Sequence, residues 1–341
     1  MEALQEIQAL REKWGKQLIL LTHHYQRAEI AVLGDVVGDS FELCRAAARA
    51  EEARTIVFCG VRFMAEAAEV LRRADQVVVH PAPEAGCPMA EMGAVDQVES
   101  AWSAIEAIRG KDRVMPVVYM NSSAPLKALV GRQGGTVCTS SNAPRAFQWA
   151  LAQREAVLFL PDEHLGRNTA RLLQIPRDRL VLWNPAQENG GLTEPQIRKA
   201  SVILWKGFCH VHTAFTVADV EAARQRHPGG KILVHPECIE DVVQLADGVG
   251  STSYLVQAVS AALPGSVIVI GTEINLIARM AQTHPDRTIL PLRRSLCPNM
   301  FRISPLRLLE SLRALPDPEP VTLPEPVREQ ARLALERMLS I

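Results

Sequence analysis

Short apolar runs alternate with helical patterns along most of the chain. The runs are rich in Val, Ile and Leu, and the segments between them, such as Ser40–Ala53 and Asp219–Arg226, carry apolar residues at helical spacing. This alternation is typical of βαβ units and parallel sheets. The pattern predicts strands in three groups: Gln17–Leu21, Thr55–Cys59 and Gln76–Val79; Val114–Met120, Thr136–Cys138, Ala156–Leu160 and Leu180–Trp183; and Lys231–His235, Gly248–Gly250, Ser266–Ile270 and Thr288–Leu290. We therefore expect an α/β fold.

The three groups place their polar residues in the same order. Each opening strand runs into polar residues, each second strand ends in small ones, and a cysteine follows the closing strand. The opening strands lead into His23-His24-Tyr25, Tyr119-Met120-Asn121 and His235-Pro236-Glu237; the second strands into Cys59-Gly60, Thr139-Ser140-Ser141 and Gly250-Ser251-Thr252; the cysteines are Cys87, Cys209 and Cys297. Ligands bind at the carboxyl ends of strands in open parallel sheets. The pattern therefore predicts three similar small α/β/α domains in a pseudo-threefold arrangement around a central active site.

We expect these domains to span residues 1–93, 94–205 and 206–304. The tail, residues 305–341, ends in a helical pattern at Pro326–Leu339 and is expected to dock on the first domain. The proline-rich stretch Pro316–Pro326 predicts an extended connector before that helix. In the second domain the long connection Asn184–Ala200 is interpreted as a surface loop, in which Thr193 caps a short helix.

Composition and charge exclude several classes of function. The 341 residues are 48% hydrophobic and carry a formal net charge of −1. Lys and Arg are spread evenly, so no basic surface predicts nucleic-acid binding. The longest apolar stretches have strand length, which argues against a membrane span, and the charged N-terminal segment lacks the apolar core of a signal peptide. The seven cysteines are odd in number, and without an export signal they favour thiols in the cytoplasm over disulfides.

The cysteines fall into two classes. Core packing is the simplest interpretation of four of them: Cys44, Cys59, Cys138 and, provisionally, Cys238. The other three, Cys87, Cys209 and Cys297, each follow a strand or turn beside Gly, Pro or His. Their wide separation excludes the spacings of zinc ribbons and ferredoxins. If they converged on one cluster, an iron without a protein ligand would remain as a Lewis acid; the spacing leaves open whether they converge.

Between about Lys16 and Ile303 the chain carries an ordered series of motifs. They are THHYQ (22–26), VGDSFEL (37–43), FCGVRFMAE (58–66), EAGCPMAEM (84–92), YMNSSAPLKA (119–128), CTSSNA (138–143), FLPDEHLG (159–166), WKGFCHVH (205–212), HPEC (235–238), GSTS (250–253), GTEI (271–274) and CPNM (297–300). Together they resemble the quinolinate synthase family. The resemblance implies a triangle of three α/β/α domains. It also implies that Cys87, Cys209 and Cys297 bind one [4Fe–4S] cluster at their junction, with one iron open.

The resemblance implies a reaction as well. Iminoaspartate condenses with dihydroxyacetone phosphate, losing phosphate and water, to give quinolinate for NAD synthesis. The substrates are small molecules, and L-aspartate oxidase or aspartate dehydrogenase would be a transient partner. Two alternatives stay open: another [4Fe–4S] hydro-lyase, and a non-catalytic cluster protein that acts as a redox sensor or electron carrier. A nucleotide-binding dehydrogenase is disfavoured because no strand leads into GxGxxG.

Anionic substrates need hydrogen-bond donors, which hydroxyls and backbone amides at helix starts supply. Ser40 begins a helical segment and Ser140 ends a strand before another such segment. The resemblance implies that both serines bind anionic groups of the substrates, and Thr252 is a third candidate. A helix cap is the alternative role for Ser40, and a turn cap for Thr252. We expect Glu237, between Pro and Cys after a strand, to be a general base. The alternative is a carboxylate that interacts with a helix dipole.

The remaining site residues are assigned with the help of the resemblance. Tyr25 and His23 are expected to position dihydroxyacetone phosphate and to move protons. Tyr119 and Asn121 would bind the other substrate or the intermediate. The third wall would carry two histidines as donors or acids: His212 and His235. For a lone histidine at a strand end, a purely structural role is the alternative, above all for His212.

The chain departs from the usual family pattern at three positions. His24 stands where the family has Asn, Arg62 stands at a frequent histidine, and Tyr254 follows GSTS where a small or polar residue is common. None of them is a cysteine or a principal polar residue of the predicted site. The departures therefore concern details of the substrate pocket.

Overall fold

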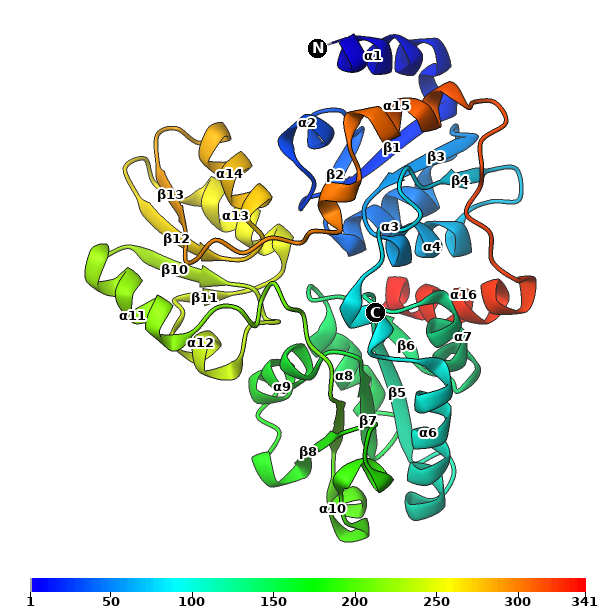
Figure 1. The fold of residues 1–341 in the computed structure, drawn as a ribbon. Helices are drawn as coiled ribbons and strands as arrows, with labels where there is room; N and C mark the ends of the chain where they lie inside the picture. The colour runs from blue at the N-terminus through cyan, green and yellow to red at the C-terminus, as the bar shows by residue number, and fades with distance from the viewer. Residues whose placement is uncertain (1) are drawn as a thin grey trace.

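The computed structural model describes residues 2–341 as three α/β units around a common centre (Figure 1). Within these residues the strands form three parallel sheets of four, five and four strands, with helices against their faces. The predicted fold class is confirmed. A strand that is covered on both faces consists almost entirely of apolar residues, and this is why the sequence pattern predicts most of these strands.

The first sheet has the strand order β2-β1-β3-β4. Its strands are β1 (Leu18–His23), β2 (Val36–Gly38), β3 (Thr55–Cys59) and β4 (Val77–Val79), and its helices are α2 (Ala28–Ala31), α3 (Ser40–Arg49) and α4 (Arg62–Leu71). A capping box starts α3: the Asp39 side chain accepts from backbone N–H groups of the first turn, and Glu42 accepts from the Asp39 N–H. The cap fixes where Ser40 enters the helix.

The second sheet has five strands in the order β6-β5-β7-β9-β8. Its strands are β5 (Val114–Tyr119), β6 (Thr136–Cys138), β7 (Ala156–Leu160), β8 (Leu180–Trp183) and β9 (Val202–Trp205), and its helices are α6 (Val95–Arg109), α7 (Ala124–Arg132), α8 (Ala143–Leu151), α9 (Glu163–Leu172) and α10 (Glu194–Lys199). Every residue of β5, β7 and β9 is buried. The predicted cap of α10 is confirmed, since the Thr193 hydroxyl accepts from the Gln196 N–H.

The third sheet has the order β11-β10-β12-β13. Its strands are β10 (Lys231–Val234), β11 (Gly248–Val249), β12 (Val267–Gly271) and β13 (Thr288–Pro291), and its helices are α11 (Val217–Arg226), α12 (Glu240–Leu245), α13 (Thr252–Ala261) and α14 (Ile274–Thr283). Buried apolar residues of this unit form two clusters of their own. In contrast, one continuous cluster extends across the first and second sheets. The third unit is therefore the more independent body.

The three sheets repeat one topology. In each, the opening strand lies second, and the next strand along the chain lies beside it at the edge. These edge strands are β2, β6 and β11. The residues that directly follow them are therefore equivalent in the three units: Asp39-Ser40, Thr139-Ser140 and, one residue further on, Ser251-Thr252. The prediction that Cys59-Gly60 holds this place is wrong. β2 has three residues, too few to register as an apolar run.

The fourth place in each sheet is held by β4, β9 and β13. A cysteine follows each of these strands along the chain: Cys87, Cys209 and Cys297. β9 is absent from the predicted strands, and β8, which was expected to close the second group, is instead the edge strand beside it. The extra strand explains why the second unit is the longest of the three.

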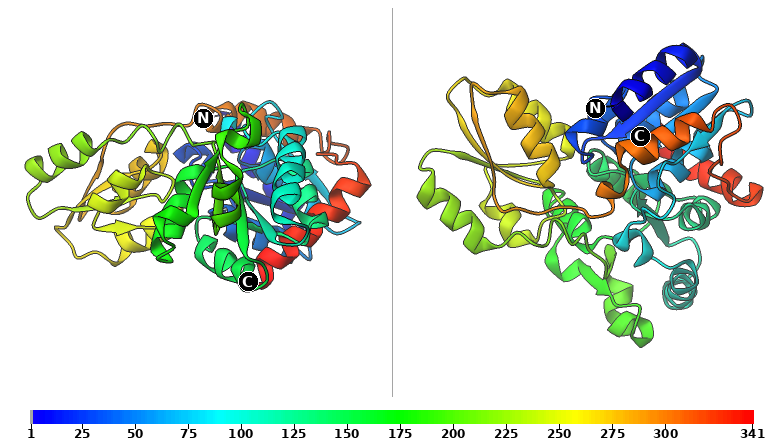
Figure 2. Two further views of the ribbon diagram at one scale, coloured as in Figure 1. Left: turned by 90° about the horizontal axis from the view of Figure 1, so that it is seen from below. Right: turned by 45° about the horizontal axis from the view of Figure 1, so that its top comes forward.

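The chain after the third sheet forms two helices, α15 (Pro305–Arg313) and α16 (Glu325–Ser340). α15 packs on α1 (Glu2–Trp14) beside the first sheet, whereas α16 packs mainly on α7 and β6 and also touches α4 (Figure 2). The tail therefore contacts both the first and the second unit. The domain boundaries at residues 93, 205 and 304 remain predictions.

No helix among residues 2–341 is long and apolar enough to cross a membrane. The short 3₁₀ turns are η1 (Gly15–Gln17), η2 (Arg177–Arg179), η3 (Glu188–Gly191) and η4 (Met300–Arg302).

Candidate active site

The carboxyl ends of the three opening strands meet at a cavity between the units. His23 ends β1, Tyr119 ends β5, and His235 directly follows β10. Every predicted site residue lines this cavity: His23, Tyr25, Ser40, Cys87, Tyr119, Asn121, Ser140, Cys209, His212, His235, Glu237, Thr252 and Cys297. Since these residues come from segments far apart in sequence, the repeat of one topology is what brings them together.

The starts of three helices also reach the cavity. Ser40 is the first residue of α3 and Thr252 the first of α13, while Ser140 lies in the turn before α8. The side chains that cap the first two are Asp39 and Ser251, one residue earlier in each case. Ser40 and Thr252 therefore point from the positive ends of helices without being the caps themselves, and the cavity can hold anions there.

The three candidate ligand cysteines lie half-buried in the cavity wall. Burial raises the pKa of each thiol, to about 12 for Cys87, and the charge of Glu237 raises all three further. None of the described residues that line the cavity is Lys or Arg, and the buried Lys127 behind the wall is the cation that acts on Cys87. Three thiolates would need more positive charge than this single side chain offers. A bound metal would supply that charge. The donor set thus fits a thiolate-bound metal centre, and the other four cysteines are buried, as predicted.

A smaller group of donors overlaps this set. One ligand atom from each of Cys209, His212 and Glu237 lies within 4.8 Å of the other two. These residues could hold a single ion, but His212 and Glu237 already satisfy each other. His212 Nδ1 lies 2.6 Å from Glu237 Oε2, and both side chains are buried.

A chain of hydrogen bonds joins Glu237 to the opposite wall. Since an ionised carboxylate only accepts, His212 donates through Nδ1 and receives at Nε2. The Thr272 hydroxyl lies 3.1 Å from His212 Nε2 and 2.8 Å from the Tyr25 hydroxyl, and Thr252 donates to Tyr25 at 3.2 Å. Tyr119 donates to the second oxygen of Glu237. Every bond therefore has one consistent direction, from Thr252 toward the carboxylate.

The charge of Glu237 is set by two opposing effects. Burial raises its pKa, but the neighbouring His212 and His235, with hydrogen bonds from His212 and Tyr119, lower the pKa to about 2. Asp162, the buried cap of α9, shows the reverse: burial and the charge of Glu237 raise its pKa far above the usual range. Glu237 is thus ionised at neutral pH.

Two histidines share one local geometry. The backbone N–H of Tyr25 donates to His23 Nδ1 at 3.1 Å, and that of Glu237 donates to His235 Nδ1 at 3.3 Å. Burial lowers the pKa of both rings, to about 3 for His235. A neutral ring that accepts at Nδ1 carries its proton on Nε2. Both histidines therefore present an N–H donor, and His235 stacks on the His212 ring at 4.3 Å.

Sequence reasoning missed several residues of this site. Thr272 is fully buried and joins Tyr25 to His212. It directly follows β12, so its place at a strand end was a usable signal. Asp39 and Thr139 also line the cavity. The Asp-x-x-Glu spacing of Asp39 and Glu42 signals a helix start, but nothing in it indicates a place at the junction.

The three departures from the family pattern lie outside the cavity lining. His24 is buried beside Arg279, with Nδ1 3.0 Å from the guanidinium. The Arg62 side chain is 63% exposed and lies 3.8 Å from Glu66. Tyr254 is partly exposed at a second, outer cavity. The three substitutions therefore leave the predicted site residues in place.

Comparison with known proteins identifies the relatives of this chain. Residues 5–340 match the sequence profile of the family described as quinolinate synthetase A protein. The chain is 46% identical to quinolinate synthase of Corynebacterium glutamicum, over 100% of the chain and 88% of that protein. It is 48% identical to quinolinate synthase of Streptomyces coelicolor, over 98% and 86%, and 44% identical to that of Bacillus velezensis, over 99% and 93%.

Proposed function

We propose that this chain, which belongs to the quinolinate synthetase A protein family, is a quinolinate synthase that condenses iminoaspartate with dihydroxyacetone phosphate, with loss of phosphate and water. Members of the family are enzymes of NAD biosynthesis. One observation carries the proposal. Thiols, acid–base groups and anion-binding hydroxyls from all three units converge on a single cavity.

We assign Cys87, Cys209 and Cys297 as the ligands of a [4Fe–4S] cluster. Three unpaired thiols in a wall without Lys or Arg support this assignment, since thiolates are the usual ligands of such clusters. When bound, a cluster with one iron free of protein ligands supplies a Lewis acid that polarises a substrate hydroxyl or carbonyl. His212 and Glu237 are left for acid–base work, because they are bonded to each other.

Glu237 is the proposed general base. Its ionised carboxylate is held by His212 and Tyr119, which fix the direction of its lone pairs. Each group in the chain from Tyr25 through Thr272 and His212 donates toward Glu237, which keeps this carboxylate ionised and fixed in position. At the far end of the chain, Tyr25 lines the cavity and is the proposed proton donor there. Burial and the charge of Glu237 raise the pKa of Tyr25, so its hydroxyl keeps its proton.

The carboxylates and phosphate of the substrates are held by neutral donors. Ser40 and Ser140 offer hydroxyls at or before helix starts, Thr252 offers one when it turns from Tyr25 to the substrate, and His23 and His235 offer N–H groups. Asn121 adds an amide beside Tyr119 in the cavity wall. Neutral donors hold anions less strongly than Lys or Arg would, which favours the release of product and phosphate.

Iminoaspartate has to be supplied by an enzyme that oxidises L-aspartate, so we expect an L-aspartate oxidase or aspartate dehydrogenase as transient partner. We assign the protein to the cytoplasm, in agreement with its seven free thiols.

Product formation and iron spectroscopy separate the candidate functions. The reconstituted protein should form quinolinate from the two substrates, and the Mössbauer signal of one iron should change when they bind. Another hydro-lyase would show the iron change without quinolinate. A redox sensor would cycle reversibly with no change on addition of substrates, and either result would refute the proposal.

A further inference from the structure

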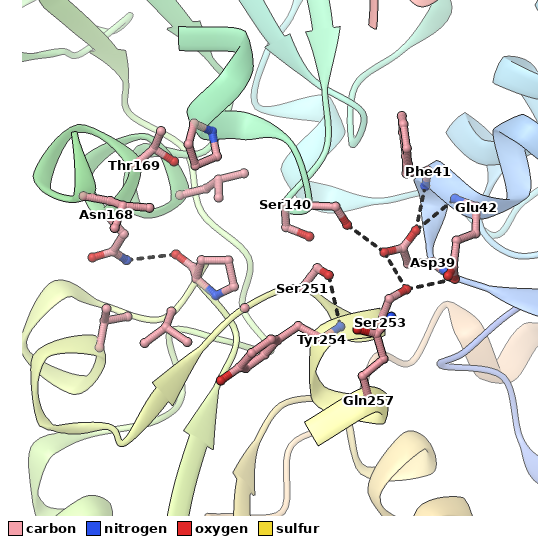
Figure 3. Close-up of a pocket in the computed structure, with 18 of the residues that line it drawn as sticks. Asp39, Phe41, Glu42, Ser140, Asn168, Thr169, Ser251, Ser253, Tyr254 and Gln257 are labelled. Carbon is pink, nitrogen blue, oxygen red and sulfur yellow. Dashed lines mark hydrogen bonds between the residues drawn. The ribbon is translucent and has the colours of Figure 1, made fainter. Parts of the chain in front are cut away.

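A second cavity lies directly outside the central one. It has a volume of about 510 Å³ and is lined by residues of all three units (Figure 3). Asp39 and Ser140 line both cavities, so the outer cavity borders the site at this point. Two exposed arginines, Arg45 and Arg171, lie on the outer cavity, whereas the central cavity has neither Lys nor Arg among its described lining residues.

One carboxylate oxygen joins the three units at this border. Asp39 Oδ2 of the first unit accepts from the Ser141 hydroxyl of the second at 2.9 Å. It also lies 2.8 Å from the Ser253 hydroxyl of the third unit, which is 2.8 Å from Glu42 Oε2 as well. Figure 3 shows Asp39, Glu42 and Ser253 facing one another between the units. We call Asp39, Ser141 and Ser253 the three-unit junction.

The other oxygen of the same carboxylate starts a helix. Asp39 Oδ1 accepts from the backbone N–H groups of Phe41 at 2.9 Å and Glu42 at 3.0 Å. The side chain is buried, and a buried carboxylate is stable only when its lone pairs are used. Asp39 therefore fixes the start of α3 and the positions of two other units with a single group.

Each residue of the junction is the chain neighbour of a proposed anion contact. Asp39 precedes Ser40, Ser141 follows Ser140, and Ser253 follows Thr252. A shift of the junction would move all three hydroxyls relative to one another. The third unit has core clusters of its own, so it is the body that such a shift would displace most easily.

We propose that the three-unit junction positions Ser40, Ser140 and Thr252 as one anion site and holds the central cavity closed toward the outer one. Asp39, Ser141 and Ser253 are thus positioning residues for the reaction. The outer cavity, with its arginines, is the access route for anionic substrates. The identity of the anionic substrates rests on the proposed function, whereas closure of the central cavity rests only on the contacts of Asp39, Ser141 and Ser253.

The test removes the two donors and leaves the helix cap intact. In the full-length chain, the Ser141→Ala/Ser253→Ala double variant takes both hydroxyls from Asp39 Oδ2, while Oδ1 still caps α3. Asp39→Asn is a second variant, because Asn caps helices as well as Asp does but is neutral. Glu240→Gln is the matched control. It removes the charge from the 2.7 Å ion pair between Arg177 of the second unit and Glu240 of the third, and neither residue lines either cavity.

Alkylation of cysteines measures closure independently of activity. The cluster-free full-length protein is treated with iodoacetamide, and the labelling rates of Cys87, Cys209 and Cys297 are followed by mass spectrometry, with the fully buried Cys138 as internal reference. Loss of two hydrogen bonds to a charged group predicts a rise of about tenfold or more at the three cavity cysteines in the double variant. Labelling of Cys138, and all rates in Glu240→Gln, should match the wild type.

Kinetics of the reconstituted enzyme complete the test. The junction variants should raise KM for dihydroxyacetone phosphate by about tenfold with a smaller fall in kcat, as expected when binding contacts are misaligned. Folded variants with wild-type labelling rates and wild-type KM would overturn the inference. Faster labelling in a protein that makes no quinolinate would refute the proposed function while keeping the closure.

Discussion

His212 Nδ1 lies 2.6 Å from Glu237 Oε2, with both side chains buried at the centre of the molecule. His212 comes three residues after Cys209, and Glu237 comes three residues after Val234, the last residue of β10. One hydrogen bond thus couples the base to the segment that carries a proposed ligand. The histidine that sequence reasoning rated as the weaker candidate is the one that orients the base.

Glu237→Gln should keep iron content and lose turnover. Glutamine retains the size of the side chain but cannot take a proton, so kcat should fall by about 10²- to 10⁴-fold. Iron analysis and an anaerobic assay of the same preparation measure both quantities. Glu240→Gln, a change in α12 at a side chain that lines neither cavity, is the control and should keep both. Near-normal turnover in Glu237→Gln would return Glu237 to a structural role.

Thr272→Val should break the hydrogen-bond chain between Tyr25 and His212 while keeping the volume of the side chain. Valine matches threonine in volume but offers no hydroxyl to Tyr25 and His212, so we expect kcat to fall by about tenfold or more. Thr272→Ser restores the hydroxyl and should recover most of the loss. If Val and Ser variants were equally slow, packing rather than the hydroxyl would be what matters at this position.

Single alanine substitutions of the three cavity cysteines should each remove iron and turnover together. Cys138→Ala is the control, because Cys138 is fully buried in β6 and lines no part of the cavity. It should lose about 1 kcal/mol of folding free energy through lost packing and keep its iron. Metal content after anaerobic reconstitution and urea unfolding measure the two effects. Cys87→Ala with a full complement of iron would refute the ligand assignment.

Lys127 predicts an unusual dependence of stability on pH. It is fully buried, donates to the carbonyls of Met120 and Ser122, and lies over the Phe63 ring. Burial lowers its pKa to about 8. Between pH 8 and about 10.5 the unfolded chain therefore binds a proton that the folded chain does not. Through this group, stability rises with pH across that window and is constant below it.

Lys127→Met isolates this contribution from that of other groups. The difference in unfolding free energy between wild type and variant should shift by up to about 3 kcal/mol in favour of the wild type from pH 7.5 to 10.5. Urea unfolding at several pH values measures it. A difference that stays constant over this range would mean that Lys127 keeps its usual pKa.

The sequence pattern could predict the repeat and the meeting of strand-end residues at one cavity, because both follow from where the strands end; the roles of these residues came from the family resemblance and remain predictions. Buried strands give clear apolar runs, and polar residues lie at their ends: His23 and Tyr119 are the last residues of β1 and β5, and His235 directly follows β10. The strand β2 was not predicted, because its three residues are too few to form a recognisable apolar run. Without β2, the sequence could not show that Asp39-Ser40 is equivalent to Ser251-Thr252.

The three-unit junction could not be predicted at all. In the sequence, Asp39 has only the pattern of a helix cap. Its contacts to Ser141 and Ser253 depend on how the second and third units are oriented relative to the first. Sequence spacing carries no information on such placement. The packing of α16 on α7 is similar, since an amphipathic helix shows which face it buries and not against what.

Anaerobic reconstitution tests the proposed cluster and the proposed reaction in one preparation. The protein is reconstituted anaerobically with iron and sulfide, both are quantified per chain, and quinolinate is assayed from iminoaspartate and dihydroxyacetone phosphate. We predict about four irons and four sulfides per chain, with quinolinate formed in the same preparation. A chain that binds no cluster, or a fully loaded one that forms no quinolinate, would contradict the account.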